Sequence, residues 1–111
     1  RVCRYRPGGF FATHFDGGHA VDQGLMSFKT FMLYLNTIDE SAGGPTTFYT
    51  KAQKKYRKLT DPSCVTYRFQ PEAAACLVFS SEILHDGGEL QHGAKWILRT
   101  EVMYRYAGKA V

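Results

Sequence analysis

Two residues near the start of the sequence, His14 and Asp16, are of types that bind transition metals and lie two positions apart. Side chains at positions i and i+2 of a β-strand point to the same face, so this pair would offer a ring nitrogen and a carboxylate oxygen to one point. A second histidine from a distant strand would complete the 2-His-1-carboxylate triad, which holds iron(II) and leaves positions open for a chelating co-substrate and O₂. The alternative is a histidine beside a turn and an aspartate that caps Gly17.

Three further histidines are candidates for the third ligand. His85 follows the apolar segment 76–84 and precedes the Asp-Gly-Gly sequence at 86–88, so we predict that it stands at a strand end, before a turn. His19 lies in a glycine-rich loop and His92 in a polar loop, where a solvated imidazole is the usual role. We therefore take His85 as the candidate third ligand.

Two cations occupy one face of the last predicted strand, 95–106, where Lys95 and Arg99 alternate with Ile97 and Glu101. Cations that point into a barrel need an anion to offset their desolvation, and a dicarboxylate would supply it. Arginine offers a planar fork to a carboxylate, whereas lysine offers a point charge. The alternative is a surface ladder in which Arg99 pairs with Glu101.

Short segments separated by glycine, proline, aspartate and serine make up most of the chain, and they predict strands at 10–15, 28–36, 46–50, 64–70, 76–79 and 95–106. This spacing is typical of a β-sandwich or barrel. In the segment 28–36, Thr30 and Tyr34 share one face, and the Tyr34 hydroxyl needs only some polar partner near the mouth of the barrel. The sequence therefore predicts an all-β domain with at most a minor helix.

The composition is that of one ordinary globular domain: 111 residues, 44% hydrophobic, 22% charged, with a net charge of +4. Much of the positive charge lies in one cluster, which we predict to be an exposed loop or a short helix: Lys51, Lys54, Lys55, Arg57 and Lys58. Such a cluster is usually a solvated face. The functional alternative is a rim that attracts an acidic or polymeric substrate.

The three cysteines leave at least one unpaired and show no CxxC spacing, which argues against zinc and favours a reducing compartment such as the cytoplasm. Cys76 lies in an apolar run, and we expect it to be a small buried residue. The longest strongly apolar stretch, 31–35, is far too short to cross a bilayer. Because the chain opens on Arg1, we expect it to be a piece of a longer protein.

The order of these elements resembles the iron(II)- and 2-oxoglutarate-dependent dioxygenases of the prolyl 4-hydroxylase family, from about Tyr5 to Tyr104. The resemblance rests on five successive elements: the tyrosine, turn and HxD sequence YRPGGFFATHFD at 5–16, then YLN at 34–36, GGPTTF at 43–48, the segment 71–79 with His85, and GAKWILRT at 93–100. The basic residue Lys95 follows His85 by ten positions, as in the family. The glycine pair is followed by Pro45, where the family often has an acidic or small residue.

The resemblance implies a double-stranded β-helix, or jelly roll, over residues 1–111, without the N-terminal helices and strands that usually buttress the family's barrel. It implies that His14, Asp16 and His85 hold iron(II). It also implies that Lys95 binds the far carboxylate of 2-oxoglutarate with help from Tyr34, Tyr5 and, less directly, Thr30. Arg99 would face the same interior and contact co-substrate or substrate.

The implied reaction is hydroxylation of an unactivated C–H bond with release of succinate and CO₂. Ascorbate (vitamin C) would be the reductant, and a proline-containing peptide or a small molecule the substrate. Two alternatives stay open: a nucleic-acid demethylase of the same chemistry, supported by the basic cluster alone, and a catalytically inactive jelly-roll binding domain. A cupin-type protein would show a denser His/Glu cluster than this chain has.

Overall fold

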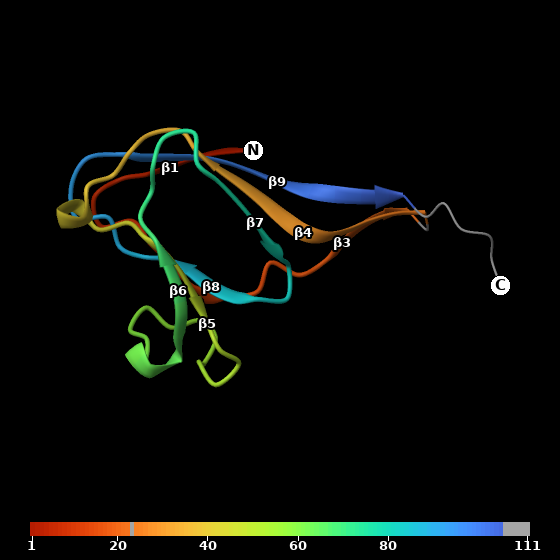
Figure 1. Ribbon diagram of the computed structural model, residues 1–111, viewed down its shortest axis with the longest axis horizontal. Coiled ribbons are helices and arrows are strands. Elements are labelled where there is room, and N and C mark those ends of the chain that lie inside the picture. The colour runs from red at the N-terminus through yellow and green to blue at the C-terminus, as the bar shows by residue number, and fades with distance from the viewer. Residues whose placement is uncertain (23, 106–111) are drawn as a thin grey trace.

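A computed structural model describes residues 1–22 and 24–105 as two antiparallel sheets that face each other in a jelly roll (Figure 1). The larger sheet has the order β1-β9-β4-β3, and β7 also pairs with β4. Its strands are β1 (Val2–Tyr5), β3 (His19–Asp22), β4 (Leu25–Tyr34), β7 (Cys76–Ser80) and β9 (Lys95–Arg105). The smaller sheet has the order β2-β8-β5-β6, with strands β2 (Phe11–His14), β5 (Thr46–Tyr49), β6 (Val65–Phe69) and β8 (Leu84–Gly87).

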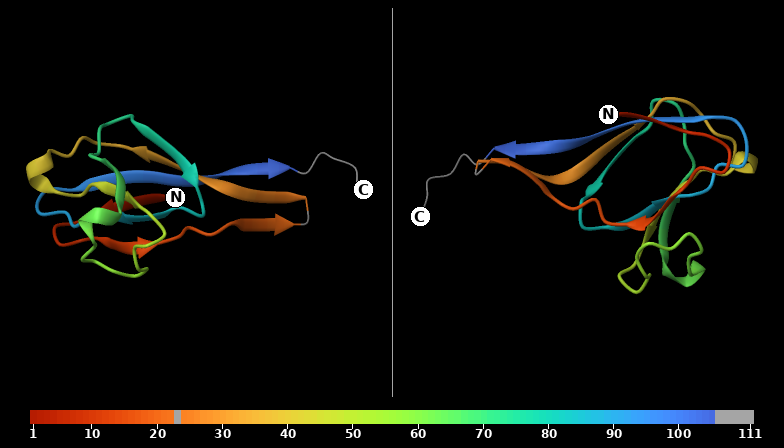
Figure 2. Two further views of the ribbon diagram at one scale, coloured as in Figure 1. Left: turned by 60° about the horizontal axis from the view of Figure 1, so that its bottom comes forward. Right: turned by 180° about the vertical axis from the view of Figure 1, so that it is seen from behind.

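The long strands β4 and β9 form the spine of the larger sheet, and their paired ends extend with β3 beyond the barrel (Figures 1 and 2). Thr30 and Tyr34 share one face of β4, as the sequence predicted, and this face, with Met32, is buried. The main core cluster fills the space between the sheets with Met32, Tyr34, Phe48, Phe79 and Ile97. This apolar cluster packs the two sheets against each other.

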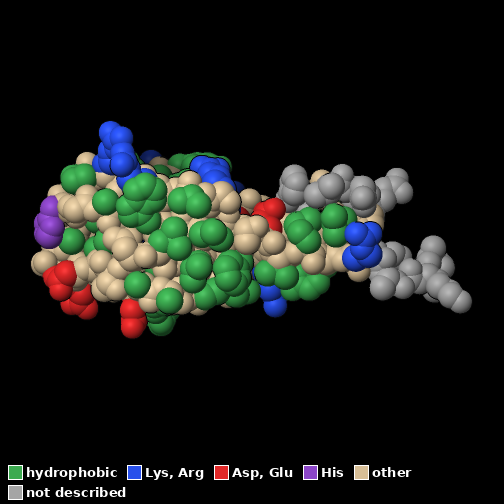
Figure 3. Space-filling model, turned by 90° about the horizontal axis from the view of Figure 1, so that it is seen from above, with side chains coloured by type: hydrophobic (Ala, Val, Ile, Leu, Met, Phe, Trp, Pro, Cys, Tyr) green, Lys and Arg blue, Asp and Glu red, His purple; other side chains and the backbone are tan. Residues whose placement is uncertain are grey.

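The outer face of the larger sheet carries exposed apolar side chains. Figure 3 views the molecule from the side of β1, β9 and β7 and shows apolar groups spread over this face. Val2, Val78 and Trp96, which belong to the strands of this sheet, are each more than a third exposed.

The six predicted strands are confirmed with shifted ends, since β4 begins three residues earlier than predicted and β7 ends one residue later. The loop alternative for the basic cluster is confirmed over a helix. In the described part of the chain, helical structure is limited to two 3₁₀ turns, Glu40–Ala42 and Pro62–Cys64. Three strands were not predicted: β1, β3 and β8. The expected turn at 86–88 is wrong at its first two residues, because Asp86 and Gly87 are buried in β8 and pair with β5.

The expectation for Cys76 is also wrong, because its side chain is exposed. Phe79 points into the core, and two-residue alternation along β7 then sends Cys76 and Val78 outward. Cys3, Cys64 and Cys76 are all free thiols. Within the described residues, no helix is long and apolar enough to cross a membrane.

Candidate metal centre and co-substrate cavity

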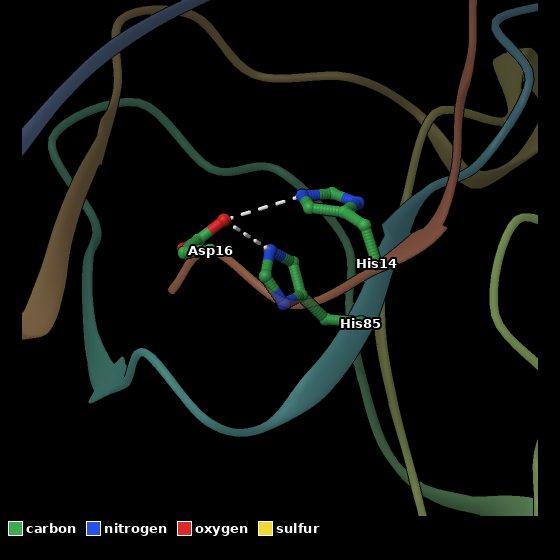
Figure 4. Close-up of side chains that lie close together, drawn as sticks. All are labelled: His14, Asp16 and His85. Atoms are coloured by element: carbon green, nitrogen blue, oxygen red, sulfur yellow. Dashed lines mark ion pairs between the residues drawn. The ribbon is translucent and has the colours of Figure 1, made fainter. Parts of the chain in front are cut away.

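The three candidate ligands converge at one end of the barrel, as Figure 4 shows. His14 Nε2 lies 3.2 Å from Asp16 Oδ1, and His85 Nε2 lies 3.3 Å from the same oxygen. All three candidate ligand atoms lie within 4.8 Å of one another. Adjacent ligands of an octahedral ion with bonds of about 2.1 Å are about 3 Å apart, so the spacing matches a facial triad.

The strands that position the two histidines are neighbours in the smaller sheet. His14 of β2 lies directly opposite His85 of β8, and an irregularity in β2 between Phe11 and His14 precedes this pair. His14 ends β2, so Asp16 lies beyond the strand and not within it as the i, i+2 argument assumed. His85 lies inside β8 and not at its end, and the strand that supplies it, distant in the sequence, is the neighbour of β2 in the sheet.

Both histidines are held in one tautomer by the backbone. Nδ1 of His14 lies 2.8 Å from the Ala12 carbonyl, and Nδ1 of His85 lies 3.0 Å from the Ile83 carbonyl. A carbonyl oxygen only accepts, so each Nδ1 carries a proton, and Nε2, which faces Asp16, is the nitrogen that would bind a metal ion. Histidines that bind metals are usually held in this way.

Asp16 is the anionic centre of the cluster, and its side chain is fully buried. Thr30 Oγ1 donates a hydrogen bond to Oδ2, and Arg99 Nη2 lies 2.8 Å from Oδ1. Burial by itself would raise the pKa of Asp16, but the neighbouring His14, His85 and Thr30 side chains outweigh it and hold the pKa far below its usual range. Asp16 is therefore a carboxylate at neutral pH.

Asp16 Oδ1 is buried and accepts no well-directed hydrogen bond. The Arg99 guanidinium lies beside this oxygen, and the two imidazole Nε2 atoms that face it are nitrogens that could bind a metal ion. The donor set of two nitrogens and one carboxylate oxygen suits iron(II). The residues present therefore fit a bound iron.

A cavity of about 470 Å³ runs from this cluster to Lys95, between the edge strands β1 and β2. His14 and His85 line one end of the cavity, and Tyr5, Thr46 and Lys95 line the other. A volume of this size suits a small molecule. The cavity thus joins the candidate metal centre to a buried cation.

Lys95 is almost completely buried. Its ammonium donates to the Gly44 carbonyl at 2.9 Å and lies 4.6 Å from the centre of the Tyr5 ring. Burial lowers the pKa of Lys95 to about 8, although the nearby Asp86 carboxylate raises it in part. Among the described residues, no carboxylate lies within ion-pair distance of Lys95. The lysine therefore has room for one incoming anion.

The remaining predicted residues have separate places. Tyr34 is fully buried, and its hydroxyl shares a hydrogen bond with the Thr46 hydroxyl on the cavity wall. Arg99 faces the interior as predicted, but its partner is Asp16 and not Glu101. His92 is exposed, and the His19 side chain lies outside what the structure describes.

The sequence argument missed Asp86, a second buried acid on the cavity wall. Tyr49 donates a hydrogen bond to its Oδ2 at 2.6 Å, and burial raises the pKa of the Asp86 carboxyl. Its position next to His85 was the available signal, but the Asp-Gly-Gly sequence suggested a turn. The sequence argument also missed Thr46, which bonds Tyr34, and the Gly44 carbonyl, which bonds Lys95, and no sequence feature indicated either contact.

The model of the 2OG-Fe(II) oxygenase superfamily matches residues 1–101 of the chain. The chain belongs to this superfamily. Iron(II) and 2-oxoglutarate are the metal and the co-substrate that the superfamily's name gives. No curated protein matches the chain significantly.

Solved structures share the fold. A Pseudomonas putida prolyl-4-hydroxylase is 20% identical with a TM-score of 0.66, over 99% of this chain and 52% of that one. A viral collagen prolyl hydroxylase of Paramecium Bursaria Chlorella virus-1, solved with 2-oxoglutarate, is 24% identical with a TM-score of 0.64, over 94% of this chain and 56% of that one. A Phytophthora capsici prolyl 4-hydroxylase is 22% identical with a TM-score of 0.59, over 96% of this chain and 31% of that one. The chain thus spans about half the length of the first two.

Proposed function

We propose that the protein is an iron(II)- and 2-oxoglutarate-dependent dioxygenase that hydroxylates an unactivated C–H bond of a proline-containing peptide. One observation carries the proposal. The two histidines of a His–Asp–His cluster of facial-triad dimensions line the cavity at one end, and a buried lysine without a carboxylate partner lines it at the other. A dicarboxylate that also chelates a metal is the ligand that this pair of ends would accept.

His14, Asp16 and His85 would hold the iron, with Thr30 and Arg99 fixing the Asp16 carboxylate from outside. Iron and 2-oxoglutarate, when bound, would supply the activation of O₂, and succinate and CO₂ would leave. The protein's own part is to orient these groups and exclude water. Ascorbate would serve as the reductant, as the family resemblance implies.

Lys95 would bind the far carboxylate of 2-oxoglutarate, because a buried ammonium forms a strong charge-assisted hydrogen bond with a carboxylate. The Tyr5 ring lies beside the same ammonium. Tyr34 would act through the Thr46 hydroxyl, which it bonds and which lines the cavity.

The substrate assignment rests on the solved relatives whose names give prolyl hydroxylation. A succinate-release assay on the intact protein, with iron(II), 2-oxoglutarate and ascorbate, tests it against proline-rich peptides and methylated oligonucleotides. We expect succinate release to be stimulated by at least one peptide, and mass spectrometry to find a gain of one oxygen on that peptide. If only the methylated oligonucleotides stimulate succinate release, the substrate is a nucleic acid and not a peptide. A protein that binds neither iron nor 2-oxoglutarate would be the inactive domain.

A further inference from the structure

The basic loop, residues 51–60, joins β5 to β6 by way of the second 3₁₀ turn and carries five cations and no acid. All five are exposed: Lys51, Lys54, Lys55, Arg57 and Lys58. Two large side chains of the same loop are also held in solvent, Tyr56 at 76% exposure and Leu59 at 89%. Cations interleaved with exposed bulky side chains are a more specific feature than a charged surface alone.

The basic loop is fixed to the free edge of β2, the edge strand of the smaller sheet. Thr13 makes four hydrogen bonds with it. The Thr13 amide donates to the Arg57 carbonyl and the Tyr56 amide to the Thr13 carbonyl, while the Thr13 hydroxyl donates to the Lys54 carbonyl and accepts from the Arg57 amide. Since Thr13 directly precedes His14, the loop is anchored one residue from the candidate metal centre.

Tyr56 has a φ of 59°, in the left-handed region that side chains other than glycine seldom adopt. Its amide hydrogen bond to Thr13 keeps it there. The backbone therefore holds the ring outward at some conformational cost, which is more often found at functional surfaces than elsewhere.

The basic loop also reaches the rim of the cavity. The Lys58 ammonium lies 4.6 Å from the centre of the Phe10 ring, and Phe10 lines the cavity. Lys58 pairs with Glu89 at 2.8 Å, the one ion pair that the loop forms with any described carboxylate. Lys51, Lys54 and Arg57 pair with no described carboxylate, so their charges are available to a partner on the same loop.

We propose that the basic loop is a docking surface for an acidic segment of a peptide, beside the reacting position. Carboxylates of the peptide would pair with Lys51, Lys54 and Arg57, and its apolar side chains would pack on Tyr56 and Leu59. An acidic peptide fits better than a nucleic acid, because Tyr56 is the sole aromatic ring of the loop and base stacking uses several. The identification of this peptide as the substrate rests on the proposed function.

Binding without iron or 2-oxoglutarate tests the surface separately from the chemistry. The probes are a fluorescein-labelled peptide of alternating glutamate and leucine, the same peptide with glutamine for glutamate, and an oligothymidylate of equal charge. We expect the acidic peptide to bind more tightly than the other two, and more weakly as salt rises. The double variant Lys51→Gln, Lys54→Gln should weaken its binding roughly fivefold to tenfold, since exposed ion pairs are individually weak.

A matched double variant, Lys29→Gln with Arg105→Gln, removes two exposed cations from outside the basic loop. It should bind the acidic peptide as the unchanged protein does, and Tyr56→Ser should weaken binding without any change of charge. Equal losses in the two double variants, or tighter binding of the oligothymidylate, would overturn the proposal. A protein that binds the acidic peptide here but never releases succinate would refute the proposed function and leave the docking surface standing.

Discussion

Two cations four residues apart on the same face of β9 have opposite surroundings. Lys95 is almost fully buried and has a carbonyl and an aromatic ring for neighbours. Arg99 has a side chain that is 27% exposed and already faces a carboxylate, Asp16. They lie about 13 Å apart along the strand, too far to share one small carboxylate.

The difference indicates which cation is available to a ligand. A buried ammonium without a carboxylate partner is costly to keep charged, and its lowered pKa expresses that cost. An incoming carboxylate offsets it. Arg99 has its counter-ion within the protein, so a ligand gains less from it. Lys95 is therefore the expected anchor for 2-oxoglutarate, and Arg99 supports Asp16.

The largest expected effect comes from Asp16→Asn, which removes the carboxylate that Arg99 faces. We expect the affinity for Fe(II), or for Co(II) as a spectroscopic probe, to fall more than a hundredfold, since even outer partners of a metal ligand contribute ten- to a hundredfold. Calorimetry measures the affinity, with Asp39→Asn, an exposed aspartate, as the matched control. Undiminished metal binding by Asp16→Asn would exclude this carboxylate as a ligand.

Lys95→Met tests the lysine end of the cavity. It should raise the KM for 2-oxoglutarate about ten- to a hundredfold, because a buried charge-assisted contact contributes on the order of 1.5–3 kcal/mol. Metal affinity should stay nearly unchanged, since the ammonium bonds the Gly44 carbonyl and no candidate ligand. Lys29→Met, at an exposed position, is the control. A loss of metal binding equal to that of Asp16→Asn would mean that the two ends of the cavity do not act separately.

The lowered pKa of Lys95, about 8, predicts a pH dependence. As the pH rises through 8 the lysine loses its proton, and the affinity for 2-oxoglutarate should fall by up to about tenfold per pH unit. Stability of the unliganded protein has the opposite sign. Between about pH 8 and the ordinary lysine pKa of 10.5, the unfolded chain binds more protons than the folded one, so the Lys95 contribution makes the free energy of unfolding rise with pH.

The falling affinity is measured by titration of 2-oxoglutarate at several pH values. Lys95→Arg, which stays charged over this range, should remove the fall above pH 8 even where its affinity is lower. A pH profile that is the same in the unchanged protein and in Lys95→Arg would assign the titration to another group.

Much of this comparison could be predicted from sequence, and the failures have physical causes. Two-residue alternation placed Lys95 and Arg99 on one face, and His85 was chosen correctly from three candidates for convergence with His14 and Asp16. Alternation cannot show which acid approaches from another element, so Asp16 was missed as the partner of Arg99. Asp86 was missed because the first two residues of the Asp-Gly-Gly sequence lie in a short, buried strand whose partners come from distant segments.

The smallest expected effect is that of Arg99→Gln on 2-oxoglutarate. If Arg99 acts through Asp16, its loss should raise the KM for 2-oxoglutarate by no more than about threefold, well below the effect of Lys95→Met. Metal affinity should fall about tenfold, the lower end of what outer partners of a metal ligand contribute. Arg99→Lys should recover part of that loss, because it keeps a cation near Asp16 Oδ1 but not the planar fork. The two titrations, metal and 2-oxoglutarate, are made on the same preparations. If Arg99→Gln raises the KM more than Lys95→Met does and leaves metal binding intact, Arg99 is the anchor and the assignment of the two cations is reversed.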